Sequence, residues 1–410
     1  MKKIVIIGGG AAGMAAAIAA ADEDRSAEVR ILERLDSPGK KLLATGNGRC
    51  NLTNRYAAPA HYRTSSPAAL ERIFCGMTPE SVLDFFRQLG LWCAEEDEGR
   101  WYPRSRQAAA VAEILQLALH RRGIWTECAC PVTAISKREQ GFVLESADGR
   151  KQFADAVILT SGGKAAGKLG SDGSGYRLAK SMGHHWAPLY PALVPLKCDM
   201  SRWGSLKGIR AEAGLRLLAG ETLLGEEQGE VQFTEYGLSG IPVMQLSGCL
   251  AGKVPGAAAA AELDLFPETE EELLLQELRR RKQQDGALSC EQLLLGMVHP
   301  RLGWAVLRDV GVASLSLPVK ELSEQTLRRV ACDLKHWRFP VLGTQGYDSA
   351  QVSGGGILLE EIQPETMEST LQPGLYFAGE ILDVAGDCGG YNLHFAWCSG
   401  IRAGKNAAGR

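Results

Sequence analysis

The first 33 residues restrict the fold of this chain more than any other segment, because they combine a strand, a glycine turn, a helix and a second strand that ends in an acid. Residues 4–7 are apolar on both faces, as expected of a strand inside a parallel sheet. A turn of the pattern G-x-G-x-x-G follows, and small residues continue as a helix to Ala21. Residues 29–32 form the second strand, and Glu33 comes about 20 residues after the last glycine of the turn.

This order is typical of a site that binds the pyrophosphate of a dinucleotide at a helix N-terminus. The first glycine permits the tight turn, the second lets the backbone approach the pyrophosphate, and the third lets helix and strand pack closely. The predicted contacts are Gly8, Gly10, Ala11, Ala12, Gly13 and Glu33. An acid at the strand end favours a ribose without a 2′-phosphate, which leaves FAD or NAD rather than NADP. The alternative is a tight turn between buried elements, followed by a surface Glu33.

A second glycine-rich segment, residues 162–168, matches a P-loop up to its lysine. The next residue is Leu169, where a P-loop has the hydroxyl that holds Mg²⁺. We therefore exclude a nucleotide triphosphatase.

Composition narrows the class of protein. Of the 410 residues, 45 % are hydrophobic and 23 % are charged, which is typical of a globular chain. The net charge of −3 provides no basic field, so we predict no nucleic-acid partner. Eleven scattered cysteines favour the reducing cytoplasm and predict no metal site. The apolar N-terminus resembles a secretory signal, but its glycines argue against one, and we predict no membrane association.

Two further segments have the composition expected of loops that contact a long dinucleotide. The segment 37–54 is rich in glycine and asparagine and follows the second strand, where a loop faces the ligand crevice of an open α/β sheet. Its cationic and amide groups could hold a pyrophosphate or the edge of a flavin ring, although an ordinary polar loop is the alternative. Its candidate residues are Lys40, Lys41, Gly48, Arg49, Cys50 and Asn51.

The second segment lies near the C-terminus. Residues 374–380 resemble a short buried strand that ends in an acid, and a second glycine turn then enters an apolar helix. The free N–H groups at the start of that helix could stabilise negative charge on a reduced ring. The candidates for cofactor binding are Gly379, Glu380, Asp383, Gly390, Tyr391, Asn392 and Leu393. In this interpretation, strands from both chain ends share one sheet.

A flavin performs the difficult step itself, and the protein binds and orients it. Our candidates for a catalytic role are Arg49 and Tyr391. Cys50 has no cysteine neighbour within five residues, so a disulfide-reductase mechanism is not expected. His394 lies among apolar residues and is expected to be a core histidine. Since no second dinucleotide fingerprint occurs, NAD(P)H would have to visit as a transient donor, and otherwise oxygen or another acceptor would complete the cycle. The alternatives to an enzyme with a small substrate are a flavin-carrying binding or electron-transfer module and a nucleic-acid-modifying flavoprotein.

Several motifs together resemble the BaiN or aminoacetone-oxidase-like family of FAD-dependent flavoproteins. They are the N-terminal turn, GNGRCNLTN, TMES, GLYFAGEILDV and GGYN, in this order along the chain. The resemblance implies an FAD cofactor and a small organic substrate. One branch of the family is linked to reduction of conjugated enones in bile-acid breakdown, and another to oxidation of aminoacetone. One departure is His394, where many relatives have glutamine.

The resemblance also implies further contacts and an architecture. Val132 would meet the adenine through its backbone, and Gly162 and Gly163 would close over the adenosine. The implied fold is α/β, with a Rossmann-type FAD domain built from both chain ends, an inserted β-rich barrel-like domain and a small helical subdomain. The expected ranges are 1–191 and 345–410 for the FAD domain, 192–260 and 312–344 for the β-rich domain, and 261–311 for the helices.

Local patterns in the middle of the chain agree with this architecture. Short alternating runs after residue 192 indicate strands with polar turns. Residues 268–283 form a charged amphipathic helix, and its basic run 279–282 is expected to be a solvated helix end. Further short helices are expected in 286–311 and 323–331, and the alanines 257–261 are expected to connect the β-rich part to the helical part.

Overall fold

The computed structural model describes residues 1–251, 259–284 and 288–409. The chain forms two compact units. Unit 1 comprises Met1–Ala192 and Tyr347–Arg410, and unit 2 comprises Leu193–Gly346. Both chain ends therefore belong to unit 1, and the middle of the chain is a separate insertion.

Unit 1 is built on a five-stranded parallel sheet in the order β20-β11-β1-β2-β7. Its strands are β1 (Lys3–Ile7), β2 (Glu28–Leu32), β7 (Trp125–Glu127), β11 (Ala156–Leu159) and β20 (Leu375–Phe377). β1 lies between two parallel neighbours, which explains why both of its faces are apolar. β20 comes from the C-terminal segment and pairs with β11, so the prediction of a Rossmann-type sheet built from both chain ends is confirmed.

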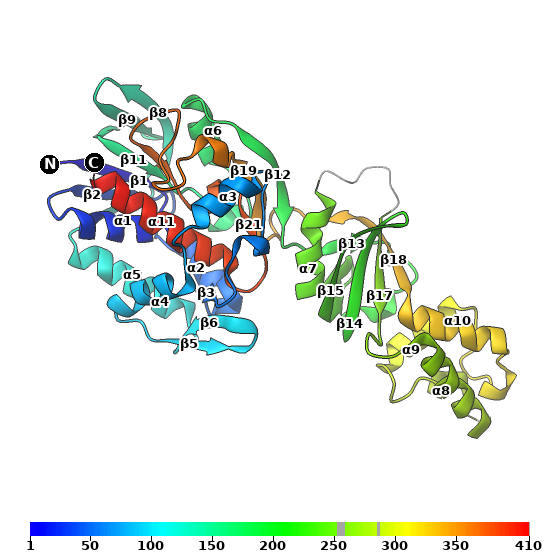
Figure 1. The fold of residues 1–410 in the computed structure, drawn as a ribbon. Coiled ribbons are helices and arrows are strands. Elements are labelled where there is room, and N and C mark those ends of the chain that lie inside the picture. The colour runs from blue at the N-terminus through cyan, green and yellow to red at the C-terminus, as the bar shows by residue number, and fades with distance from the viewer. Residues whose placement is uncertain (252–258, 285–287, 410) are drawn as a thin grey trace. The chain divides into compact units, whose positions relative to one another are not determined.

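Two helices from opposite ends of the chain pack side by side against this sheet (Figure 1). They are α1 (Ala11–Glu23) and α11 (Tyr391–Gly409). A Cβ atom at Gly400 would lie 2.4 Å from the carbonyl oxygen of Ala12, and one at Gly404 would lie 2.1 Å from that of Ala16. These two glycines therefore bring the two helix backbones into direct contact, which fixes the C-terminal helix on the N-terminal one.

The remaining elements of unit 1 surround this framework. The helices are α2 (Lys40–Ala44), α3 (Pro67–Phe74), α4 (Pro79–Gln88), α5 (Ala108–Arg121) and α6 (Ser174–Ser181). Small sheets are formed by β3 (Thr53–Asn54), β5 (Cys93–Glu96) and β6 (Arg100–Pro103), by β4 (Tyr62–Arg63) and β21 (Ala385–Gly386), by β8 (Val132–Arg138), β9 (Gly141–Ser146) and β10 (Lys151–Ala154), and by β12 (Trp186–Ala192) and β19 (Val352–Ile357).

Unit 2 contains a closed barrel in the order β13-β16-β15-β14-β17-β18. The strands are β13 (Leu196–Cys198), β14 (Arg210–Ala219), β15 (Thr222–Phe233), β16 (Gly237–Ser239), β17 (Ala259–Asp264) and β18 (Trp337–Thr344). Four aromatic side chains that contact one another in tilted and edge-to-face arrangements belong to its core, namely Trp203, Phe233, Trp337 and Phe339. The barrel is accompanied by helices α7 (Ile241–Ser247), α8 (Glu271–Gln284), α9 (Pro300–Asp309) and α10 (Glu324–Lys335).

The boundary between the barrel and the helices of unit 2 differs from the helical subdomain expected at 261–311. Ala259–Ala261 belong to strand β17 and not to a connection, while Ala257 and Ala258 lie outside the described residues. Small residues suit this strand because it is paired on both sides, with β14 and β18. α10 packs against α8 although it lies beyond residue 311, because its apolar face needs that partner.

Candidate functional site

The glycine turn after β1 contains glycines of two kinds. Gly8 has a φ of +109°, and a Cβ there would lie 2.6 Å from the carbonyl oxygen of Thr160. A Cβ at Gly13 would lie 1.9 Å from the carbonyl oxygen of Gly8. A Cβ at Gly10, in contrast, would meet no protein atom within 4 Å, and its φ of −78° is accessible to any residue. Gly10 therefore keeps open a space that the protein itself does not fill.

That space lies at the N-terminus of α1. The first backbone hydrogen bond of this helix runs from the N–H of Met14 to the carbonyl oxygen of Gly10, and no side chain caps the helix. The preceding N–H groups, of Ala11, Ala12 and Gly13, are the donors that a helix leaves unused at its start. A dinucleotide pyrophosphate fits here, because these donors and the helix dipole both favour an anion.

Glu33 follows β2 and is 7 % exposed, so it is not a surface acid. Its carboxylate accepts one hydrogen bond from the N–H of Gly9, at 2.7 Å, and another from the N–H of Leu35, at 2.8 Å. A carboxylate has about four lone-pair positions, so two remain for the hydroxyls of a ribose. The two backbone bonds hold the carboxylate beside the glycine turn, where the ribose of a dinucleotide would lie.

The residues expected to enclose the adenosine come from two further segments. Val132 is the first residue of β8, and the segment before it runs beside Glu33, since the N–H of Cys130 bonds to the carbonyl oxygen of Glu33 at 2.8 Å. Gly162 has a φ of +72°, and Gly163 lies so close to Glu380 that a Cβ would be 2.8 Å from its carboxylate. Gly163 thus lies beside the C-terminal segment of the site, whereas a Cβ at Gly162 would lie 2.5 Å from the hydroxyl of Ser171.

Glu380 joins the two cofactor segments predicted from opposite ends of the chain. One of its oxygens is 2.5 Å from Nζ of Lys41, and the other accepts the N–H of Ser353 at 3.0 Å. The hydroxyl of Ser353 also accepts hydrogen bonds from the N–H groups of Lys164 and Ala165. Sequence reasoning missed Ser353, because no spacing or motif marks it. Gly379 precedes Glu380 with a φ of +78°, and a Cβ there would lie 2.8 Å from that of Ala12.

Asn51 provides a second indication of where a ligand would bind. It is buried, and its Oδ1 has no hydrogen-bond partner among the described residues. A Cβ at Gly390 would lie 2.7 Å from this oxygen, so the acceptor faces the glycine turn that starts α11. A buried acceptor without a donor costs about 1–3 kcal/mol. The imide N–H of a flavin ring is a donor of the required kind, so the residues present fit FAD.

Other predicted side chains are held by protein partners. Arg49 lies 3.2 Å from Glu96 and 4.4 Å above the ring of Tyr102, and Lys40 pairs with Asp36. The remaining side chains with protein partners are Asp383, which accepts from Ser65 and Thr64, and Asn392, which bonds to Gly386 and Asp387. Gly48 has a φ of +82° and is open to solvent, and Leu393 is half-buried. These side chains shape the loops around the proposed site.

Two residues singled out in the sequence are part of the core. Cys50 is fully buried, and burial raises the pKa of its thiol to about 12, so it is not a reactive thiolate. His394 is also fully buried, and its Nδ1 lies 2.9 Å from the hydroxyl of Thr53. Burial lowers the pKa of His394 to about 4, which keeps the ring neutral. His394 is therefore a core histidine, as expected.

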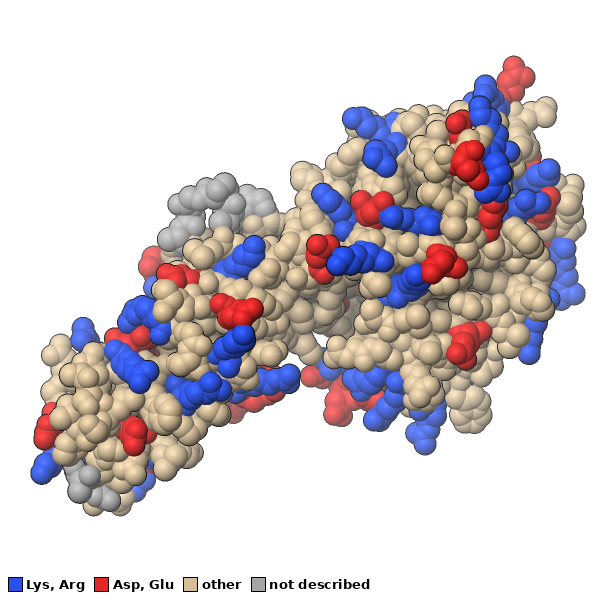
Figure 2. Space-filling view, turned by 180° about the vertical axis from the view of Figure 1, so that it is seen from behind, with Lys and Arg blue, Asp and Glu red and all other residues tan. Residues whose placement is uncertain are grey.

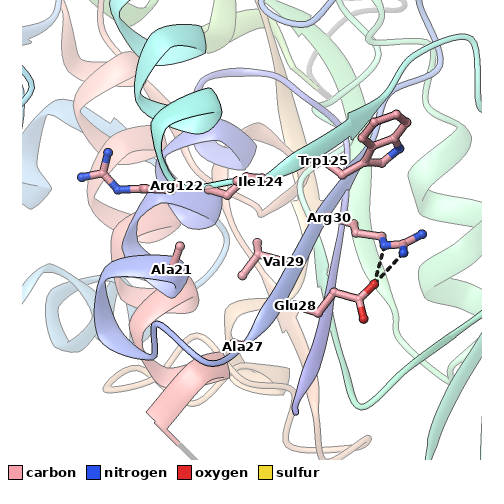
Figure 3. Close-up of a pocket in the computed structure, with 9 residues that line it drawn as sticks. Ala21, Ala27, Glu28, Val29, Arg30, Arg122, Ile124 and Trp125 are labelled. Atoms are coloured by element: carbon pink, nitrogen blue, oxygen red, sulfur yellow. Dashed lines mark hydrogen bonds and ion pairs between the residues drawn. The ribbon is translucent and has the colours of Figure 1, made fainter.

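One cavity lies at the opposite end of the sheet (Figure 3). It has a volume of about 210 Å³ and is lined by residues at the amino ends of β2 and β7, among them Val29 and Trp125. Arg30 at its edge pairs with Glu28, as Figure 3 shows. Dinucleotides bind at the carboxyl ends of parallel strands, so this cavity is not the cofactor crevice.

Among the residues that the structure describes, no group of three or more His, Cys, Asp or Glu side chains is placed to hold a metal ion. None of the helices described is both long enough and apolar enough to cross a membrane.

The parallel sheet, the glycine turn and the acid at the end of β2 define the class as a Rossmann-type dinucleotide-binding protein. The chain belongs to the HI0933-like family, since the model of the HI0933-like protein Rossmann domain matches residues 2–406. It is 41 % identical over 411 residues to a 3-dehydro-bile acid delta(4,6)-reductase of Clostridium scindens, with full coverage of both chains. It is 29 % identical to a ribosomal RNA dihydrouridine synthase of Escherichia coli, with 90 % of each chain covered.

Solved structures support the fold. A 3-ketosteroid delta1-dehydrogenase of Sterolibacterium denitrificans matches with a TM-score of 0.51 at 14 % identity, covering all of both chains. The FrdA chain of the Escherichia coli quinol fumarate reductase matches with a TM-score of 0.51 at 17 % identity, covering 100 % of this chain and 70 % of the other. Family and fold together identify the protein as an FAD-dependent oxidoreductase, as predicted.

Proposed function

We propose that this enzyme reduces a carbon–carbon double bond conjugated to a carbonyl group in a small organic substrate, such as a 3-oxo steroid or bile acid. The observation that carries the proposal is the full-length similarity, at 41 % identity, to a reductase of this kind. The electron donor in this proposal is NAD(P)H, which visits without a domain of its own. The eleven cysteines form no disulfide in the part of the chain that the structure describes, which agrees with a cytoplasmic location.

The residues of this chain would bind and orient the cofactor. The N-terminus of α1 would hold the pyrophosphate beside Gly10, and Glu33 would bind the ribose. Lys41 and Glu380 would hold the middle of the cofactor, and Asn51 with the glycine turn at Gly390 would hold the ring. When FAD is bound and reduced, it supplies a hydride to the electron-poor carbon of the double bond.

The reduction also needs a proton on the neighbouring carbon, and the two sequence candidates differ in their suitability. Arg49 is engaged by Glu96 and Tyr102 and does not lose its proton at ordinary pH. Tyr391 starts α11 beside the flavin segment, and burial raises the pKa of its phenol. Tyr391 thus keeps its proton and stays a candidate for contact with the substrate.

A second candidate function is reduction of uridine in ribosomal RNA, which the name of the 29 % identical relative suggests. The chemistry is related, because the double bond of uracil is also conjugated to a carbonyl. On the face shown in Figure 2, basic and acidic side chains are interspersed, without a large area of positive charge. An extended nucleic-acid partner requires a basic surface, and the net charge of the chain is −3, so we favour the small substrate.

The test uses photoreduced holoprotein under anaerobic conditions. It is mixed with a 3-oxo-4,6-diene bile acid, with unmodified ribosomal RNA or with buffer, and return of the oxidised-flavin spectrum is followed. We expect rapid reoxidation by the bile acid and a product that has gained two hydrogen atoms by mass spectrometry. Reoxidation by the RNA alone would replace the proposal with the second candidate. Bleaching of the oxidised enzyme by aminoacetone would instead indicate amine oxidation.

A further inference from the structure

A histidine and an aspartate that the sequence analysis did not connect lie beside the proposed flavin segment. Nδ1 of His61 is 3.2 Å from a carboxylate oxygen of Asp387. The imidazole ring stacks on the ring of Tyr391, with ring centroids 4.5 Å apart and an angle of 22° between the planes. Tyr391 directly follows Gly390, where a Cβ would lie 2.7 Å from the unpartnered Oδ1 of Asn51. The histidine thus lies next to the turn that would hold the ring.

The fold holds this histidine in place from several sides. The N–H of Asp387 bonds to the carbonyl oxygen of His61 at 2.9 Å, directly after the pairing of β4 with β21. Asn392 holds the loop that contains Asp387, because its side-chain amide donates hydrogen bonds to the carbonyl oxygens of Gly386 and Asp387. About a third of the His61 side chain remains exposed, at 36 %. The ring is therefore anchored but still accessible.

We propose that His61 is the catalytic proton donor of the reduction and that Asp387 is its positioning residue. This inference rests on the proposed function. Asp387 accepts the proton on Nδ1 and so orients the ring, which leaves Nε2 as the nitrogen for the substrate. The carboxylate also stabilises the cationic form of the imidazole, the form that donates a proton. The ring of Tyr391 serves as the platform on which the imidazole is stacked.

Atoms and electrons balance in the proposed reduction. A hydride, with two electrons, adds to the carbon of the double bond remote from the carbonyl. The resulting enolate takes a proton from Nε2 of His61 at the carbon next to the carbonyl. The double bond would become a single bond, bound reduced FAD would supply the hydride and be left oxidised, and His61, left neutral, would regain its proton from water. NAD(P)H then reduces the flavin for the next cycle.

The charged and titratable groups around His61 come from several elements. Asp387 faces it from the loop after β21, and Tyr391 faces it from α11. Around Tyr391 lie Arg100, Glu98 and Tyr56. Arg100 pairs with Glu98, so no unbalanced charge from that side opposes an imidazolium. The carboxylate of Asp387 is therefore the charged group that directly contacts the His61 ring.

The first experiment measures reoxidation of photoreduced holoprotein by a conjugated 3-oxo bile acid as a function of pH. General acids contribute about 10²–10⁴-fold to rates. We expect His61→Gln to slow reoxidation by at least 100-fold and to abolish the decline in rate as pH rises through the range where imidazole loses its proton. Asp387→Asn should lower kcat at least tenfold with little change in KM. Tyr391→Phe should retain the pH-dependent decline.

Controls separate this role from a structural one. His61→Gln should bind FAD in the same ratio as the wild type and unfold at the same temperature. His120, at the end of α5 and exposed, provides the matched variant. His120→Gln should match the wild type in rate and in pH profile.

The second experiment does not depend on turnover. The oxidised holoprotein is titrated with 4-nitrophenol, whose phenolate resembles an enolate, and the absorbance of the bound anion is recorded. We expect His61→Gln to weaken binding of the phenolate at least tenfold, while His120→Gln leaves it unchanged.

The outcomes distinguish the two proposals. A wild-type enzyme that no conjugated ketone reoxidises would overturn the proposed function, and the donor role of His61 with it. A wild-type enzyme that is reoxidised, together with a His61→Gln variant of unchanged rate and pH profile, would overturn the assignment of His61 alone. Loss of the pH-dependent decline in Tyr391→Phe would transfer the role to Tyr391.

Discussion

At the scale of single residues, the glycines show which positions serve folding and which serve a ligand. Gly8 and Gly13 are surrounded by backbone atoms, whereas a Cβ at Gly10 would meet nothing in the protein. The same motif therefore contains two structural positions and one that is open.

We expect Gly10→Val to fold normally and to bind no FAD, because its side chain would occupy the space for the pyrophosphate. Gly13→Val is the contrasting variant, since its side chain would strike the carbonyl oxygen of Gly8 and impair folding. The ratio of flavin to protein, measured beside the unfolding temperature, checks both. A Gly10→Val protein with a full complement of FAD would contradict this geometry.

His394 gives a prediction for pH. Its pKa is lowered from 6.5 to about 4 by burial, so the folded protein holds the neutral ring while the unfolded chain takes up a proton. The stability contributed by the neutral ring is fully present above about pH 6.5 and is lost as the pH falls from there toward about 4.

The free energy of unfolding of His394→Gln should therefore fall less steeply than that of the wild type between pH 6.5 and 4. The difference should be on the order of 1–3 kcal/mol, measured by urea unfolding at several pH values. Glutamine is suitable because it can still bond to Thr53. Parallel pH curves for the two proteins would show that another group dominates in this range.

At the scale of elements, the contact between α1 and α11 decides how the chain ends are joined. Gly400 and Gly404 are spaced one helical turn apart and let the α11 backbone rest on Ala12 and Ala16. The sequence predicted both helices, but it did not show that these glycines face α1.

We expect Gly404→Ala to destabilise the protein by about 1–3 kcal/mol, since its methyl group would overlap the carbonyl oxygen of Ala16 and force the helices apart. The same substitution at Gly409, where the nearest atom is 4.0 Å away, is the control and should change stability little. Denaturant midpoints of the three proteins provide the measurement. Equal midpoints for Gly404→Ala and the wild type would contradict the close contact.

In unit 2, the basic side chains of residues 279–282 have partners within the protein. Arg279 and Arg280 pair with Glu324 and Glu277, and Arg281 donates to the carbonyl oxygens of Leu293 and Leu295. Lys282 donates to the carbonyl oxygen of Leu322. Arg281 and Lys282 thus hold neighbouring segments of unit 2, Arg279 links α8 to α10, and Arg280 pairs within α8. The run is therefore more than the solvated helix end expected from the sequence, because part of it has a structural role.

At the scale of the whole molecule, the insertion of unit 2 leaves the FAD framework intact. Ala192 pairs with Val352 across β12 and β19, so the two crossing points of the chain lie near each other in unit 1. Every residue proposed to bind FAD belongs to unit 1.

We therefore expect a chain in which a short glycine–serine linker replaces residues 193–346 to fold and to bind FAD. Absorbance of bound flavin after gel filtration provides the measurement, and the same chain with Gly10→Val is the negative control. A soluble, folded chain that does not take up FAD would show that the cofactor site requires unit 2.

The sequence by itself determined the N-terminal strand, turn, helix and acid, because hydrophobic period and the demands on glycine act over a few residues. It also predicted the shared sheet and the FAD cofactor. The tertiary structure alone decided that Lys41 meets Glu380, that His61 meets Asp387, and that α10 packs on α8. These partners lie tens to hundreds of residues apart, and no local pattern encodes which distant side chain will satisfy a buried charge or an apolar face. Packing makes that choice, once the two chain ends have closed on each other.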